Sequence, residues 1–110
     1  MSYYMFQMSY AQSAIKALVE KPTDREAAAR KLIEALGGKL NHLFFSFGKY
    51  DVVALSEFPD DKSAMAVAAA IGASGAASSM LTTKLMSPAD AMAAMGLAAK
   101  ATGTYKAPQA

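Results

Sequence analysis

The sequence of 110 residues has no cysteine, no tryptophan and a single histidine, His42. Without cysteine, a disulfide scaffold, a cysteine zinc site and an iron–sulfur cluster are excluded, and one histidine excludes a histidine-rich metal site. No stretch approaches the roughly 18–20 uninterrupted large apolar residues of a membrane-spanning helix. We therefore predict no cofactor, no metal and no membrane insertion.

The chain also lacks a large excess of either charge, since 11 basic and 9 acidic residues give a formal charge of +2. The lysines are scattered rather than adjacent, so the phosphate-tracking patch of a nucleic-acid-binding protein is missing. Residues 1–9 lack the basic cluster and apolar region of a secretory signal. We expect no nucleic-acid partner and a cytoplasmic location.

What the chain has in excess is alanine, with 25 residues, together with eight methionines. Alanine buries little apolar surface, so the larger apolar side chains must supply most of the cohesion. The methionines fit the role of adaptable core filler better than that of a soft-metal site. At this length we expect one domain, over residues 1–103, followed by a flexible tail over residues 104–110.

Hydrophobic periodicity predicts the secondary structure. Strands are expected at 3–8, 40–47, 50–58 and 79–86, and helical stripes at 11–18, 29–36, 64–71 and 89–96. Hydroxyl and acidic side chains at the predicted helix starts are expected to act as N-caps, namely Ser9, Thr23, Asp60 and Ser87. Gly48 and Lys49 are predicted to form a two-residue hairpin turn, with Gly48 at positive φ.

This order of elements is the split βαβ pattern of ferredoxin-like domains. We predict an α+β fold, ferredoxin-like βαββαβ, with a four-stranded antiparallel sheet, helices on one face and an extra C-terminal helix. Alternation places Leu40 with His42 and Phe44 on one sheet face, and Leu43, Phe45 and Phe47 in a helix-packed core. Because both faces carry apolar residues, the face without helices needs a cover. We expect self-association, as a homodimer or a larger symmetric oligomer.

The segment Gly48-Lys49-Tyr50-Asp51-Val52-Val53 resembles the signature of the GYD family, small bacterial and archaeal proteins named for a glycine, tyrosine and aspartate at the start of a strand. The resemblance covers roughly residues 3–95 and includes Glu34 to Leu40 before the signature and Glu57 to Asp61 after it. It implies a ferredoxin-like fold related to dimeric α/β barrels, and it implies no particular chemistry. The alanine-rich second half and the tail depart from the family pattern.

Polar residues within the predicted sheet are the candidates for a ligand site. His42 is a candidate proton relay, and Asp51 either caps the turn or accepts hydrogen bonds at a functional mouth. We predict that one set of side chains faces the open side of the sheet, where a second subunit would enclose them: Gln7, His42, Asp51, Glu57 and Lys84. Tyr50 is a further ligand-binding candidate. The alternative is that these groups only pair with one another, as Lys84 with Glu57, across a wet interface.

Two classes of function remain open on these residues. One is a homo-oligomeric module that binds a small molecule between paired sheets. The other is a small enzyme of the dimeric α/β-barrel kind: a cofactor-free oxygenase, an isomerase or a haem-degrading monooxygenase. The haem version depends on His42 as the axial ligand.

Overall fold

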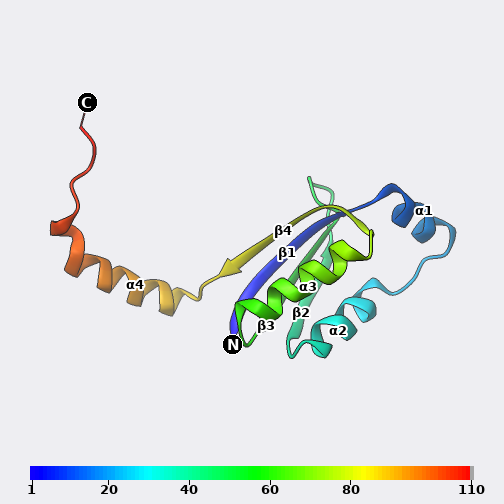
Figure 1. Cartoon of the computed structure of the whole chain (residues 1–110), viewed down its shortest axis with the longest axis horizontal. Helices are drawn as coiled ribbons and strands as arrows, with labels where there is room; N and C mark the ends of the chain where they lie inside the picture. The colour runs from blue at the N-terminus through cyan, green and yellow to red at the C-terminus, as the bar shows by residue number, and fades with distance from the viewer. Residues whose placement is uncertain (110) are drawn as a thin grey trace.

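The four strands form one antiparallel sheet in the order β2-β3-β1-β4. This computed structural model describes residues 1–109, and Figure 1 shows its elements. The strands are β1 (Ser2–Tyr10), β2 (Lys39–Phe45), β3 (Val52–Phe58) and β4 (Ala77–Leu85). The helices are α1 (Gln12–Glu20), α2 (Arg25–Ala35), α3 (Asp61–Ala73) and α4 (Pro88–Ala101), followed by the 3-10 turn η1 (Thr102–Thr104). The chain has the ferredoxin-like α+β fold with an added C-terminal helix.

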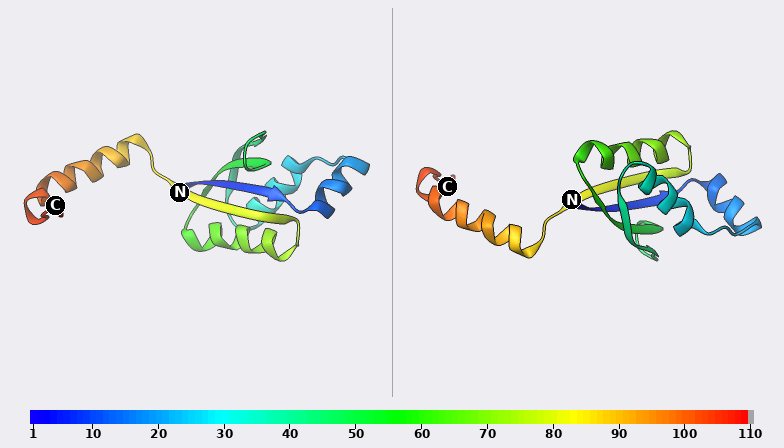
Figure 2. Two further views of the ribbon diagram at one scale, coloured as in Figure 1. Left: turned by 90° about the horizontal axis from the view of Figure 1, so that it is seen from above. Right: turned by 90° about the horizontal axis from the view of Figure 1, so that it is seen from below.

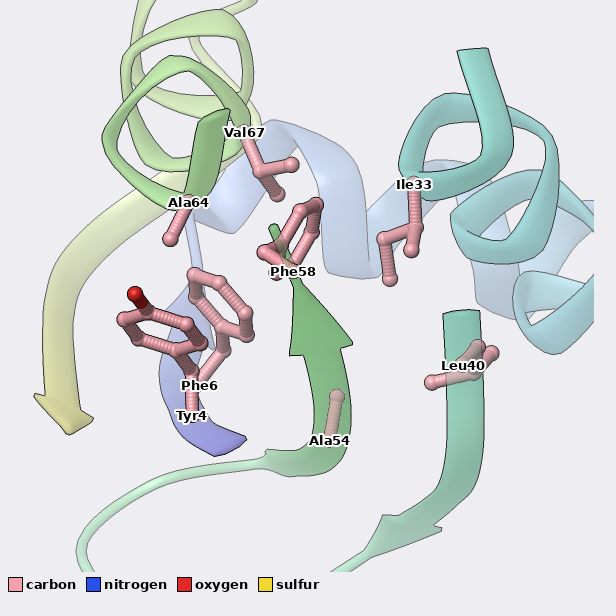
Figure 3. Close-up of a cluster of buried hydrophobic side chains, with 8 residues drawn as sticks. All are labelled: Tyr4, Phe6, Ile33, Leu40, Ala54, Phe58, Ala64 and Val67. Atoms are coloured by element: carbon pink, nitrogen blue, oxygen red, sulfur yellow. The ribbon is translucent and has the colours of Figure 1, made fainter. Parts of the chain in front are cut away.

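Helices α2 and α3 cover one face of the sheet and form the core with it. Phe58 of β3 is fully buried and lies between Val67 of α3 and Ile33 of α2 (Figure 3). The ring of Phe58 also meets those of Tyr4 and Phe6 edge to face, at centroid distances of 5.8 and 6.0 Å. Helix α1 buries no residue and lies beyond the end of β1 (Figure 2). The core therefore depends on two helices and three aromatic rings.

Local capping chemistry sets most of the helix starts. The carboxylate of Asp60 accepts from Ser63 N at 2.8 Å, and Ser87 Oγ accepts from Asp90 N at 3.1 Å, as predicted. At α2 the cap is Asp24, one residue after the predicted Thr23. The Ser9 cap was wrong, because β1 continues to Tyr10 and α1 begins at Gln12 without a side-chain cap.

The connection between β2 and β3 is longer than the predicted two-residue hairpin. Strand β2 ends at Phe45 and β3 begins at Val52, so residues 46–51 form the loop. The loop is closed by Ser46 N, which donates to Asp51 O at 2.9 Å. Gly48 does not have positive φ, so that prediction was wrong. A loop of this length reverses the chain without a left-handed residue at that position.

A β-bulge at Asn41 changes which side chains of β2 face the helices. The register shifts between Leu40, opposite Ser56, and His42, opposite Leu55. Leu40 is therefore buried under the helices, while His42 lies on the other face. The predicted grouping of Leu40 with His42 was wrong because Asn41 is an extra residue in the two-residue alternation.

The predicted core position of two phenylalanines was also wrong. Phe47 lies in the loop and is fully exposed. Phe45 points to the helix side but remains 60% exposed, because β2 is an edge strand. Its ring packs on that of Tyr10, at 6.3 Å between centroids. Of the predicted trio, Leu43 alone packs against the core cluster.

Helix α4 projects away from the sheet in all three views (Figures 1 and 2). It buries no residue of its own. The radius of gyration is 18.0 Å, whereas a compact chain of this length has about 13 Å. The helix and residues 102–109 thus stand apart from the ferredoxin-like body; Ala110, the end of the predicted tail, lies outside the described residues.

Candidate functional site

The sheet face away from α2 and α3, here called the open face, carries three neighbouring rows of side chains. Each row runs across the sheet from β2 to β4, and strand pairing defines its members. The rows are Lys39-Glu57-Tyr3-Leu85, His42-Leu55-Met5-Thr83 and Phe44-Val53-Gln7-Leu81. Each row contains both apolar and polar residues. Among the apolar members, Tyr3, Phe44 and Leu81 are 44, 59 and 45% exposed.

Three of the predicted site residues lie on this open face: Gln7, His42 and Glu57. They occupy three different rows and three different strands. Strands lie about 4.8 Å apart and alternate residues about 6.6 Å apart, so His42 and Gln7 are separated by roughly 12 Å. The structure therefore places them around an apolar patch without bringing them into contact.

A hollow of about 450 Å³ opens beside His42 on the open face. Its side chains from this face are Tyr3, Lys39, His42, Leu55 and Leu85. The His42 ring is exposed and stacks on Phe44 with 5.9 Å between centroids. This open-face hollow offers an apolar floor, an imidazole and an ammonium group, the mixed lining of small-molecule sites.

Lys84 does not belong to this site. It pairs with Tyr4, so its side chain lies on the helix face, where Nζ is 2.8 Å from Asp61 Oδ1. The expected placement on the open face was wrong, and so was the pairing with Glu57. The ammonium also lies 6.0 Å from the centre of the Tyr4 ring. Lys84 thus links β4 to the first turn of α3.

Asp61 is the centre of this small cluster and was not among the site residues predicted from the sequence. Two hydrogen bonds hold the pKa of Asp61 below its ordinary value. The larger effect comes from the Lys84 ammonium, and the next from the Tyr4 hydroxyl, which donates to the Asp61 carboxylate. The same carboxylate raises the pKa of Lys84 and of Tyr4. In the sequence, Asp61 stands out only as an acidic residue in the first turn of a predicted helix. Such a residue is explained by its favourable interaction with the helix dipole, so it does not point to a cluster with Lys84 and Tyr4. Because Asp61 and Lys84 are exposed, this pair is a structural link of modest strength.

Tyr50 and Asp51 lie at the loop end of the sheet, away from the open-face hollow. The Lys49 ammonium lies 5.8 Å from the centre of the Tyr50 ring. The backbone carbonyl of Tyr50 accepts a hydrogen bond from Ser46 Oγ. Asp51 Oδ2 accepts from the backbone N–H of Tyr10 at 2.9 Å, and Asp51 N donates to Met8 O. Of the two readings of Asp51, the structure supports the turn-bracing one.

Within residues 1–109, no three His, Asp or Glu side chains are grouped so as to hold a metal ion. No helix of those residues is both long and apolar enough to cross a membrane.

The loop over residues 46–51 carries the signature residues Gly48, Tyr50 and Asp51. A family model described as the GYD domain matches residues 4–95, from β1 into α4. The chain belongs to the GYD domain family. Among curated proteins, none matches. In this GYD chain the signature Gly48, Tyr50 and Asp51 lie in a loop that hydrogen bonds tie to the end of β1.

Several solved structures resemble this GYD chain in fold. FFRP-DM1 aligns over 78% of this chain and 100% of its own, with 15% identity and a TM-score of 0.53. The hypothetical protein PHS023 from Pyrococcus horikoshii covers 79% of this chain and 92% of its own, with 14% identity and a TM-score of 0.51. The protein At3g17210 from Arabidopsis thaliana gives the same identity and TM-score, with coverage of 79% and 95%. At this identity the likeness is one of fold alone.

Proposed function

We propose that this GYD chain is a homo-oligomeric module that packs its open face against a second copy and binds a small molecule between the two sheets. One observation carries the proposal. The open face presents apolar side chains from all four strands, and neither α2 nor α3 covers it. Apolar patches of this extent on a small protein are typical of interaction surfaces.

Helix α4 supports the same proposal from the other end of the chain. Its only charged residues are Asp90 and Lys100, near its two ends, and Met92, Met95 and Leu97 are exposed. A helix that is apolar on all sides is normally buried, and an isolated helix of this length is marginal in water. We infer that α4 packs on the second copy.

The open-face hollow supplies the small-molecule part of the proposal. In a single chain the hollow is open, and a second sheet would close it. The enclosed site would be mainly apolar, with His42 and Lys39 at its edge. A ligand with an apolar body and one or two hydrogen-bonding groups fits that lining.

Neighbouring phenylalanines of β2 provide a matched test of self-association. Phe44 and Phe45 are equally exposed, at 59% and 60%, but they point to opposite faces of the sheet. We expect light scattering to show a dimer or larger oligomer for the wild type and for Phe45→Lys, and a monomer for Phe44→Lys. A wild type that stays monomeric at micromolar concentration would contradict the proposal, as would dissociation by Phe45→Lys alone.

The contribution of α4 and of the ligand can be measured on the same samples. Met92→Glu combined with Met95→Glu should weaken the oligomer while leaving the circular dichroism of the sheet unchanged. Native mass spectrometry of the oligomer should detect a co-purified small molecule that is absent from the Phe44→Lys monomer. An oligomer that carries no ligand and gains none from a metabolite extract would leave self-association intact and refute the binding part.

A further inference from the structure

The helix-covered side of the sheet contains a cavity of about 290 Å³, here called the helix-face cavity. It lies between α2, α3 and the strands, on the opposite side of the sheet from the open-face hollow. Its walls are mainly large apolar side chains, among them Phe6, Leu32, Leu43, Val52, Val67 and Ile71. This volume is at the small end of the range for ligand sites.

The alanine content of the two helices explains why the space is empty. Ala28 and Ala29 of α2 and Ala70 of α3 all line the cavity. A methyl group is too short to bridge the gap between the helices and the sheet, whereas interiors elsewhere are filled by interlocking side chains. Water gains few hydrogen bonds in such a space, because its walls are apolar.

One charged side chain lines this apolar space. Arg25 is the first residue of α2 and is half-buried. Its hydrogen bond within residues 1–109 is a long one of 3.4 Å to Thr23 Oγ1, and no carboxylate of those residues lies within 4 Å of it. Arg30, one turn later, is by contrast paired with Glu26 at 3.5 Å. The Arg25 guanidinium is therefore a permanent positive charge without a counter-ion among residues 1–109.

The surroundings of Arg25 favour an anion of one particular shape. A guanidinium binds a carboxylate through two parallel hydrogen bonds. The N-terminus of α2 adds its own partial positive charge, which is offset in part by the capping Asp24 carboxylate that accepts from Ala27 N at 3.0 Å. Tyr10 and Ser74, which both carry hydroxyl groups, line the same cavity.

We propose that the helix-face cavity binds a small carboxylic acid. Its apolar part, one aromatic ring or a short alkyl chain, lies between α2 and α3, and its carboxylate pairs with Arg25. The cavity holds the volume of roughly ten water molecules at about 30 Å³ each, which fits one ring with a short side chain. All of the lining residues belong to one chain, so this site does not depend on the proposed oligomer.

The test compares 4-phenylbutyrate with the uncharged 4-phenylbutanamide by calorimetry and by NMR of the side-chain methyl groups. We expect the wild type to bind the acid about tenfold or more tightly than the amide, with shifts at Ile71 and Leu43. Arg25→Gln should abolish this preference and leave the affinity for the amide unchanged. Arg30→Gln, which removes the same charge one turn away, should behave as the wild type. Ala29→Leu should weaken both ligands because it fills the cavity.

Three results would overturn the proposal. The first is no binding of 4-phenylbutyrate to the wild type at millimolar concentration. The second is a preference for the acid that survives Arg25→Gln, or methyl shifts confined to Leu55 and Leu81 on the open face. The third is loss of binding in the Phe44→Lys variant, since a site within one chain must persist in a monomer. Failure of self-association would leave the expected results unchanged, so the two proposals are tested separately.

Discussion

The carboxylate of Asp51 and the backbone N–H of Tyr10 are joined by a 2.9 Å hydrogen bond that fixes the end of β1 to the start of β3. The bond lies where the pairing of β1 with β4 shifts between Ser9 and Tyr10. The aspartate of the GYD signature thus satisfies an amide at an irregular strand end. It also holds Tyr10, one of the residues that line the helix-face cavity.

Removing this carboxylate should destabilise the fold. We expect Asp51→Ala to lower the free energy of unfolding by about 1–3 kcal/mol, because the Tyr10 amide loses a charged acceptor. Asp51→Asn keeps an oxygen that can accept the bond and should lose less. Urea denaturation measures both variants; equal losses for the two would show that the hydrogen bond is not the cause.

Gly38 is required by the packing of Phe58. A Cβ at Gly38 would lie 2.4 Å from Phe58 Cε1, and the Phe58 ring is fully buried and unable to move freely. We expect Gly38→Ala to lower the free energy of unfolding by about 1–3 kcal/mol. Gly48→Ala is the matched control, since its Cβ meets nothing within 4 Å, and it should change stability by less than about 0.5 kcal/mol. A Gly38→Ala protein as stable as the control would contradict this account.

Ser56 buries a hydroxyl that has no hydrogen-bond partner among the described residues. Because an unsatisfied buried hydroxyl is unfavourable, Ser56→Ala should leave the free energy of unfolding unchanged or raise it by about 1 kcal/mol. The reverse change two residues earlier, Ala54→Ser, should lower it by about 1–3 kcal/mol, because Ala54 is also buried on the helix face. Thermal and urea unfolding of both variants check the pair, and a clear loss in Ser56→Ala would refute the prediction.

Acid should weaken the link between β4 and α3. The pKa of Asp61 is lower in the folded chain than its ordinary value because of Lys84 and then Tyr4. Such a carboxyl stabilises the fold above its unfolded pKa of about 4, and this contribution is lost as the pH falls through the lower, folded pKa. Urea titrations from neutral to acid pH should therefore show a steeper loss in the wild type than in Asp61→Asn. Asp90→Asn controls for the change in net charge, and equal slopes in all three proteins would contradict the role of Asp61.

Features that depend on neighbouring residues in the sequence were predictable. The caps at Asp60 and Ser87 and the order of strands and helices follow from short-range chemistry and periodicity. The face to which each side chain of β4 points was not predictable, because both alternating sets of residues along this strand mix polar and apolar side chains. Lys84 was expected on the open face, but pairing with β1 places Leu81 and Leu85 there instead. Only the pairing register of β4 with β1, which is distant in the sequence, decides which of the two sets lies on the open face.

The candidate site was predictable in part for the same reason. Gln7 and Glu57 lie on the expected face because β1 and β3 keep a simple alternation. His42 of β2 also lies there, because it follows the bulge at Asn41 and pairs with Leu55. The cavity beside Arg25 was not predicted, since an empty space follows from the separation of α2 from α3 and not from any motif. The alanines that line it were visible in the sequence, but they indicated only a core short of bulk.

The bulge at Asn41 reverses the sheet face to which each later residue of β2 points. For the composition of the open face, the number of residues in this strand therefore matters more than the identity of any one of them. Substitutions at His42 or Phe44 alter one position of the open face. Deletion of Asn41 would instead restore strict alternation, so that either Leu40 enters solvent or His42 enters the core. Related chains that lack this one residue would therefore present a different surface to a partner, even where every other residue of the strand is the same.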